Sequence, residues 1–243
     1  MRMLTFAKRC TKEILRDPIN LFFGLGFPTV LLLLLSAIQA NIPVTLFEIQ
    51  RLTPGITVFG LSFLTLFSAS LIAKDRESAF LQRLFTLPLG PSDFILGYLL
   101  PMLPLSMAQG AVCYVIALFL GLPVTINIVA AVWMLLPVCV LYVSLGLLCG
   151  SLLNVKQVGG ICGALLTNLS AWLSGVWFDL DLVGDAFYKI AHCLPFVHAV
   201  KLEQAVLTGS WSEVLPHLLP VIGYASVITV TAIFVFLRKM KKQ

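Results

Sequence analysis

Long, uninterrupted apolar runs constrain this chain more than any other feature of its sequence. Six such runs occur along the 243 residues. Each can cross a bilayer, because a spanning helix needs about 20 mostly apolar residues. We place the runs at 18–40, 53–73, 94–120, 124–153, 158–178 and 218–237. Their apolarity is continuous and does not alternate, which excludes a transmembrane barrel. The sequence therefore predicts an all-α integral membrane protein with six transmembrane helices and a single domain, residues 1–243.

Composition supports the same class of protein. Hydrophobic residues make up 59% of the chain and charged residues only 11%, with a mean hydropathy of +1.01. So little polar surface cannot cover a soluble globule. The first apolar run is also too long for the hydrophobic region of a cleaved signal peptide, so we expect it to be retained.

Basic residues divide unequally between the two sides that six spans define. Five precede the first span, three lie between the second and third, one lies between the fourth and fifth, and four follow the sixth. The other side carries only Arg51, Lys189 and Lys201. Because Lys and Arg in short loops are retained in the cytoplasm, both termini are predicted to be cytoplasmic. This bias accounts for the net charge of +5 and favours contact with anionic lipid, not nucleic acid.

The segment before the first span, residues 1–17, has the pattern of an amphipathic helix. Its apolar residues share one face and its cations the other: Met3, Phe6, Ala7, Cys10 and Ile14 against Lys8, Arg9, Lys12 and Arg16. Asp17-Pro18 ends the helix before the membrane. We expect it to lie among the inner headgroups. Its cations then contact either lipid phosphate or a partner protein, and the pattern leaves both open.

A second charged amphipathic stretch, residues 74–93, separates the second and third spans. Apolar and polar residues again fall on separate faces: Phe80, Leu81, Leu84 and Phe85 against Arg76, Gln82 and Arg83. Leu87-Pro88 stops the helix. We expect a cytoplasmic helix parallel to the membrane, with Glu77 near enough in depth to pair with a cation of the first helix. A solvated loop with an incidental apolar face is the alternative.

The second half of the chain adds close packing and an unusual outer connection. Gly146-x-x-x-Gly150 and Gly159-x-x-x-Gly163 flank the short polar turn 154–157 and permit close helix contact. The outer connection, 179–217, carries helical spacing up to Pro195 and again from Phe196 to Leu207. We expect two short helices there that dip into the outer leaflet.

Residues that could carry chemistry are few. On the boundaries above, the spans contain no Asp, Glu, Lys, Arg or His, whereas proton-coupled carriers need such residues in the membrane. No HExxH, GxSxG or Gly-rich phosphate loop is present. The six cysteines show no CxxC spacing, so we predict neither a metal site nor a structural disulfide. Uphill transport would then require a partner ATPase, and the chain itself is predicted to bind no cofactor.

At the level of motifs, the chain resembles the permease subunits of ATP-binding-cassette exporters of the second type, a family of bacterial drug and polysaccharide exporters. Two stretches carry the resemblance: Arg76-Glu77-Ser78, Leu81, Arg83-Leu84, Pro88, Phe94 and Gly97 after the second span, and Ser174-Gly175, Phe178, Pro195 and Ala199-Val200 in the outer region. Among the departures, Tyr98 stands where Lys is common. The order of parts matches over essentially the whole chain.

The resemblance implies a pair of permease subunits, identical or paralogous, each bound to an ATP-binding subunit that holds ATP and Mg²⁺. Residues 1–17 would be an interface helix and 74–93 a coupling helix, in a bacterial plasma membrane. The implied contacts with the ATPase are Arg76, Glu77, Phe80, Leu81, Arg83 and Leu84, with Asn154 and Lys156 at a second point. Export of an amphipathic, drug-like, peptide or lipid-linked substrate, and a role in drug resistance, would follow.

Two other classes of protein remain open at this point. An integral membrane enzyme could use the outer His and Asp residues on a lipid or wall precursor, and it would act without ATP. An ion-coupled carrier could bind sodium through backbone carbonyls and Asn127, Asn154 or Asn168. Activity of the isolated chain would favour the enzyme, and sodium dependence would favour the carrier.

Overall fold

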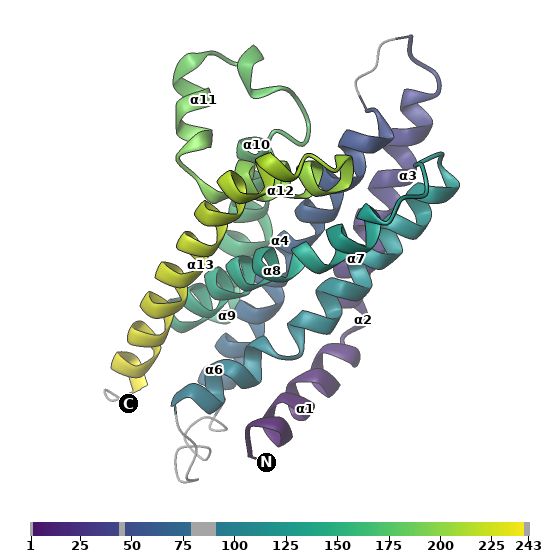
Figure 1. Cartoon of the computed structure of the whole chain (residues 1–243). Helices are drawn as coiled ribbons and strands as arrows, with labels where there is room; N and C mark the ends of the chain where they lie inside the picture. Colours follow the sequence, from purple (N-terminus) through teal and green to yellow (C-terminus); the bar gives the residue numbers. More distant parts are fainter. Residues whose placement is uncertain (1, 44–46, 79–90, 241–243) are drawn as a thin grey trace.

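The computed structural model describes residues 2–43, 47–78 and 91–240, and within these ranges the chain is mostly helical, with no strand (Figure 1). The predicted all-α class is confirmed. The helices are α1 (Arg2–Leu15), α2 (Pro18–Leu21), η1 (Phe22–Gly26), α3 (Phe27–Gln39), α4 (Ile49–Glu77), α6 (Pro91–Leu99), α7 (Met102–Phe119), α8 (Asn127–Leu152), α9 (Val155–Val158), η2 (Gly159–Leu166), α10 (Thr167–Ser174), η3 (Leu180–Leu182), α11 (Asp185–His192), α12 (Pro195–Thr208) and α13 (Trp211–Met240).

Five helical stretches of the described chain are long and apolar enough to cross a membrane: Pro18–Gln39, Ile49–Glu77, Asp93–Phe119, Asn127–Leu152 and Trp211–Arg238. The remaining predicted span, 158–178, is not among them. It corresponds to the continuous helical run of α9, η2 and α10, which ends at Ser174. Its glycines and polar residues, including Asn168, lower its hydropathy. The third predicted span is divided at Leu100 and Pro101, because proline lacks the N–H that a continuous helix needs.

Helix α4 forms the centre of the bundle and packs most extensively against α8. Glycines make this contact close. A Cβ atom at Gly146 would meet the Ser68 hydroxyl and would lie 2.6 Å from the Thr65 carbonyl oxygen. At Gly150 it would lie 2.6 Å from the Ala69 carbonyl oxygen. The first predicted small-residue pair is therefore confirmed as an α4–α8 contact within one chain, whereas a Cβ atom at Gly159 of the second pair would meet no atom of the described residues within 4 Å.

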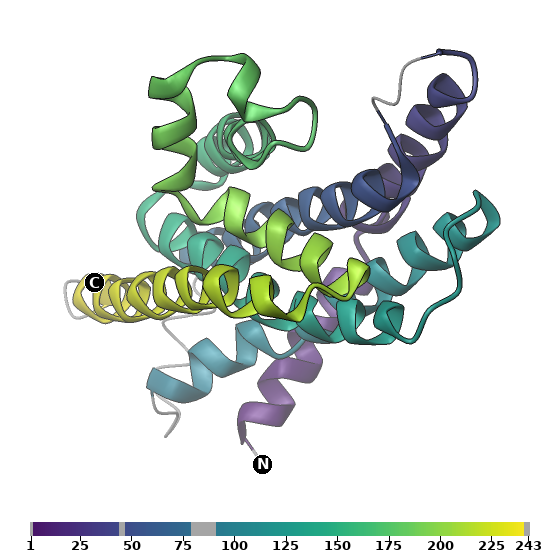
Figure 2. The same cartoon turned by 45° about the horizontal axis from the view of Figure 1, so that its top comes forward.

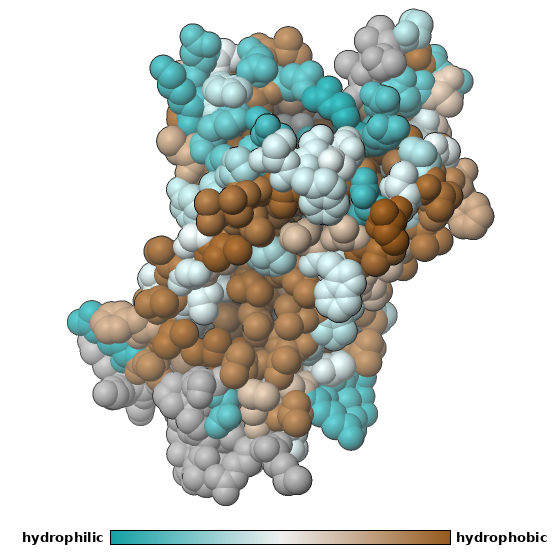
Figure 3. All heavy atoms as spheres, viewed as in Figure 1, coloured by the Kyte–Doolittle hydropathy of each residue, from teal (hydrophilic) through white to brown (hydrophobic). Residues whose placement is uncertain are grey.

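The two ends of the bundle differ in content. Both termini lie at one end, with α1 and the start of α6, which we call the terminal end (Figure 1). Helix α11 and the end of α3 lie at the opposite end, the loop end, where α12 crosses over the long helices and contacts α13, α8 and α4 (Figures 1 and 2). Apolar residues gather over the middle of the molecule and hydrophilic residues at both ends (Figure 3). Such a distribution suits a protein that crosses a bilayer.

Candidate functional site

At the terminal end, α1 is held against α6 by an aromatic contact. Phe6 lies edge-on to Phe94 and Tyr98, with ring centroids 5.7 and 5.0 Å apart. It fits there because Gly97, between those two residues, has no side chain; a Cβ atom at Gly97 would collide with the Phe6 ring. Phe94 and Gly97 were singled out in the sequence as motif residues, and the structure shows that they receive α1.

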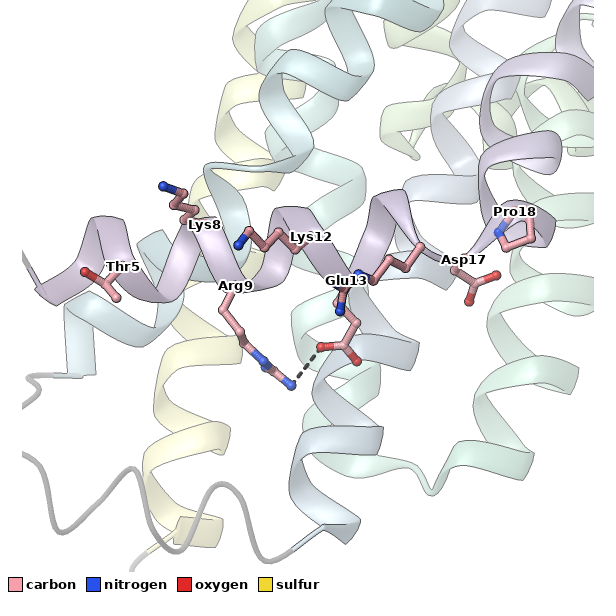
Figure 4. Close-up of a pocket in the computed structure, with 8 residues that line it drawn as sticks. Thr5, Lys8, Arg9, Lys12, Glu13, Asp17 and Pro18 are labelled. Carbon is pink, nitrogen blue, oxygen red and sulfur yellow. Dashed lines mark ion pairs between the residues drawn. The ribbon is translucent and has the colours of Figure 1, made fainter.

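A buried ion pair ties the same helix to α4. The Arg9 guanidinium donates two hydrogen bonds to the Asp75 carboxylate, at 2.5 and 2.6 Å, and the Tyr98 hydroxyl donates a third at 2.9 Å. Arg9 also pairs with Glu13 at 2.7 Å, one turn along α1 (Figure 4). Asp75 is only 2% exposed. A buried carboxylate requires such partners, since desolvation of an unpaired charge costs several kcal/mol. Three helices therefore meet at Asp75.

Electrostatics around Arg9 agree with this geometry. Burial by itself lowers the pKa of Arg9, but the hydrogen bonds and charge of Asp75 outweigh it, so the pKa is raised and the cation is permanent. Burial raises the pKa of Glu13, with Arg9 opposing the shift. Burial also raises the pKa of the neighbouring Cys10 thiol to about 12, so this cysteine stays protonated and unreactive near neutral pH.

The next two residues of α4 bind the turn between α8 and α9. Arg76 donates to the carbonyl oxygen of Gly150, at 2.9 Å, and to that of Ser151. These carbonyls belong to the last turn of α8, where carbonyl oxygens have no hydrogen-bond donor within the helix. Glu77 accepts from the Val155 N–H at 2.9 Å, at the start of α9. The end of α4 thus caps the C-terminus of α8 and the N-terminus of α9.

This turn has its own capping structure. The Asn154 side chain accepts from the Gln157 N–H at 2.8 Å, and Gln157 accepts in return from the Asn154 N–H at 3.1 Å. Such a reciprocal capping box fixes the first turn of a helix. Lys156 is exposed beside it. The two separate coupling points suggested by the sequence, 74–93 and 154–157, are therefore joined through Glu77.

The structure places only part of the predicted coupling helix. Residues Lys74 to Glu77 form the last turn of α4, which continues four residues beyond the predicted end of the second span. Phe80, Leu81, Arg83 and Leu84 lie outside the described residues. Sequence reasoning missed Asp75 as a key residue. Its signal was its spacing from Leu71 and Ile72, which places it on the buried face of α4.

At the loop end, the predicted outer landmarks shape a reversal of the chain. Gly175 adopts φ +74° and ends α10, a conformation that favours glycine. Ser174 donates to the Ala171 carbonyl at 2.9 Å. Phe178 packs against Phe187 of α11, with ring centroids 6.3 Å apart. Pro195 is the first residue of α12, where its missing N–H costs nothing. Helices α11 and α12 occupy the two stretches that the sequence predicts to be helical.

A second buried acid lies at this end. Glu203 of α12 is fully buried, and its Oε2 accepts a hydrogen bond from Tyr114 of α7 at 3.1 Å. Its Oε1 has no partner in the described part of the chain. Burial raises the pKa of Glu203 well above its usual value. The predicted spans contain no ionisable side chain, and from this we would place every such side chain outside the packed bundle; Glu203 and Asp75 are nevertheless buried in it, because α12 folds back onto the bundle and α4 extends through Glu77.

Three histidines also meet at the loop end, one from each of α11, α12 and α13. His198 Nδ1 lies 3.0 Å from His217 Nδ1, and His198 Nε2 lies 3.0 Å from the His192 carbonyl oxygen. Lys201 donates to His192 Nε2 at 2.9 Å. Within the described ranges, no three His, Cys, Asp or Glu side chains are arranged to hold a metal ion. The histidines connect neighbouring helices.

The side chains of the asparagines considered for ion binding form hydrogen bonds with backbone groups. Asn127 donates to the Leu207 carbonyl at 3.3 Å, and Asn168 donates to the Ala164 carbonyl at 2.8 Å. Asn154 is the cap described above. All three side chains stabilise helices in this structure.

These observations define a polytopic, all-helical membrane protein whose terminal end joins four helical elements to the end of its central helix. The sequence profile of the ABC-2 type transporter family matches residues 1–207, most of the chain. The chain belongs to this family, and it is a membrane permease component of an ABC transporter, a class that works with an ATP-binding partner subunit. A search of curated proteins finds no match.

Proposed function

We propose that the terminal end is the surface on which the ATP-binding subunit acts, and that the protein exports an amphipathic, drug-like, peptide or lipid-linked substrate as one of a pair of permease subunits. The supporting observation is the convergence at the last turn of α4. Asp75 binds α1 and α6, Arg76 binds the end of α8, and Glu77 binds the start of α9.

This convergence gives the chain a mechanical route from the terminal end to the membrane. A displacement of the chain segment that follows Glu77 would move the end of α4 directly, because the two are continuous in the chain. Helix α4 packs against α8, α7, α3 and α12, so it cannot move without moving the bundle. Closely packed interiors transmit such shifts because they do not deform continuously. ATP-driven movement of the partner would in this way tilt the spans and open a path toward the loop end.

The proposal also includes topology. The helical run from Val155 to Ser174 acts as a further span, which brings the number of spans to six and puts both termini in the cytoplasm of a bacterium. Helices α11 and α12 then lie in the outer leaflet. The excess of basic residues at the terminal end supports this orientation.

The test is coupling between the permease and an ATP-binding subunit encoded beside it. We expect the double variant Glu77→Ala/Arg83→Ala to insert normally but to lose transport and substrate-stimulated ATPase activity. The charge-matched control is Asp181→Ala/Lys189→Ala, which removes an exposed acid and an exposed base at the loop end and should keep both activities. Unchanged substrate-stimulated ATPase activity in the Glu77/Arg83 variant would refute the proposed coupling surface.

Glu77 also caps α9, so the effect of its charge has to be distinguished from the effect of its hydrogen bond to the Val155 N–H. Glu77→Gln keeps an oxygen that can accept from the Val155 N–H and removes only the charge. If Glu77 acts on the ATPase through its charge, Glu77→Gln/Arg83→Ala should be as defective as the alanine pair. If the cap alone matters, it should behave like Arg83→Ala.

A further inference from the structure

An open groove runs along the outward side of α1. It encloses about 870 Å³ and is lined by residues of α1 and the start of α2: Thr5, Lys8, Arg9, Lys12, Glu13, Arg16, Asp17 and Pro18. Four of these side chains are cations and two are acids. The acids are engaged: Glu13 pairs with Arg9, and Asp17 caps α2 and lies 3.8 Å from Lys74. The groove therefore carries excess positive charge.

Three of the cations have no acidic partner among the described residues: Lys8, Lys12 and Arg16. They are exposed and follow one another at intervals of four residues, so they form a continuous ridge along α1. Arg9 points elsewhere, toward Glu13 (Figure 4). The ridge is thus distinct from the ion pair that fastens α1 to α4.

Exposed apolar side chains adjoin this ridge. Leu4 and Leu15 are 60% and 62% exposed. On a helix with 3.6 residues per turn they lie within about 40° of Lys8. The apolar strip continues past the end of α1 into the first candidate span, where Ile19 and Phe22 are 68% and 55% exposed. A soluble ligand would meet the cations alone, whereas a membrane surface meets both.

We propose that the exposed face of α1 binds the phosphate headgroups of anionic phospholipids, with Lys8, Lys12 and Arg16 on the phosphates and Leu4 and Leu15 among the upper acyl carbons. The face begins one turn from a membrane-spanning helix, so the headgroup layer is the surface that it meets. An amphipathic helix with cations beside an apolar strip is the arrangement that lies in this layer. These lipid contacts would hold α1 in place, while Arg9 on the other face of α1 binds Asp75.

The test is lipid binding by the purified full-length chain in uncharged detergent. The thermal-unfolding midpoint is titrated with dioleoyl phosphatidylglycerol, dioleoyl phosphatidylcholine or glycerol phosphate. We expect phosphatidylglycerol alone to raise it. Lys8→Gln/Lys12→Gln should weaken this binding about thirtyfold, from about 1 kcal/mol for each cation near an anionic surface. The charge-matched control Lys189→Gln/Arg238→Gln, at two exposed cations away from α1, should bind as the wild type does.

Three results would overturn the proposal. Equal phosphatidylglycerol affinity in the two double variants would show that α1 is not the site. If glycerol phosphate raised the unfolding midpoint as much as phosphatidylglycerol does, α1 would bind phosphate without recognising the acyl chains of a lipid. Unchanged lipid binding with loss of the ATP-binding subunit from Lys8→Gln/Lys12→Gln would assign the face to that protein. Because the lipid titration needs no partner or transport, its failure leaves the proposed coupling surface standing.

Discussion

The terminal end and the loop end both bury polar groups, but they compensate for them differently. At the terminal end, Asp75 faces a cation, and Arg76 and Glu77 cap helix ends whose partial charges oppose their own. At the loop end, the Tyr114 hydroxyl is the hydrogen-bond partner that the described residues give Glu203, and Lys201 donates to a histidine. Opposite charges hold the first region together. In the second, the buried acid has no cation beside it among the described residues.

This difference suggests a division of labour. A junction that receives force from a partner must keep its geometry, and compensated charge with hydrogen bonds in several directions provides that. The loop end joins α12 to α13 and α11 through the His198 and His217 rings, and α12 to α7 through the Glu203 carboxyl group, all of which can gain or lose protons. It is therefore the region that we expect to respond to conditions on its side of the membrane.

The largest expected effect is at the terminal end. Asp75→Ala removes the carboxylate that Arg9 and the Tyr98 hydroxyl share, although Arg9 keeps its pair with Glu13. Breaking a buried ion pair costs about 3–5 kcal/mol. We expect the lower part of that range because the Arg9 side chain is 34% exposed. Denaturant unfolding in detergent measures the loss.

Asp179→Ala is the matched control at the loop end. It also breaks an Arg–Asp pair, that of Arg51 and Asp179 at 2.7 Å, but both of those side chains are exposed. Its cost should stay below about 1 kcal/mol. Equal losses from the two variants would remove the distinction between a buried junction and an ordinary surface pair.

A smaller effect is expected at Glu203. If this carboxyl group is neutral when buried, Glu203→Gln keeps its shape and its acceptor for Tyr114 and should change the free energy of unfolding by less than about 1 kcal/mol. Glu203→Ala leaves the hydroxyl unpaired beside a new cavity and should cost about 2–3 kcal/mol. A glutamine variant as damaged as the alanine variant would show that the charged form is the one that the fold stabilises.

The smallest effect is a pH dependence at the histidines. Burial lowers the pKa of His198; the hydrogen bond with the His192 carbonyl opposes this shift, and the charges of His192 and Lys201 add to it. The fold therefore favours neutral His198, so its contribution to stability is complete above pH about 6.5 and is lost as the pH falls below that value. From pH 7.5 to 5.5 we expect a loss of about 1 kcal/mol that His198→Asn does not show.

The comparison of variant with wild type is needed because other groups near α12 titrate too. Glu203 has a raised pKa and acts in the opposite sense, since its stabilisation falls as the pH rises above about 4.3. His192, His217, Lys201 and Glu213 also face or flank the cluster. Parallel pH profiles for wild type and His198→Asn would contradict a titratable contact at this residue.

Much of the architecture could be predicted from sequence because it depends on local patterns. The spacing of Phe6, Cys10 and Ile14 predicted the buried face of α1. The pair Gly146 and Gly150 predicted close packing, and Pro195 predicted a helix boundary. Each of these signals is written within a few residues of the feature that it determines.

The features that sequence reasoning missed depend on distant partners. Asp75 lies in a run of charges; its spacing from Leu71 and Ile72 indicates that it is buried, but nothing near it identifies Arg9, 66 residues earlier, as its partner. Glu203 was assigned to an outer connection because the pattern gives the helix but not its return onto α7. Gly159 shows the converse: a Cβ atom at Gly163, the other half of its pair, would meet Leu66, but a Cβ atom at Gly159 would meet no described residue within 4 Å.

The central claim is that the ATP-binding subunit acts at the terminal end, and hydrogen exchange of the assembled transporter tests it most directly. The account predicts slower exchange on addition of that subunit in peptides covering residues 74–93 and 150–158, with peptides covering 185–208 unchanged. Protection confined to 185–208, or absent from both terminal segments in a complex that hydrolyses ATP, would contradict it.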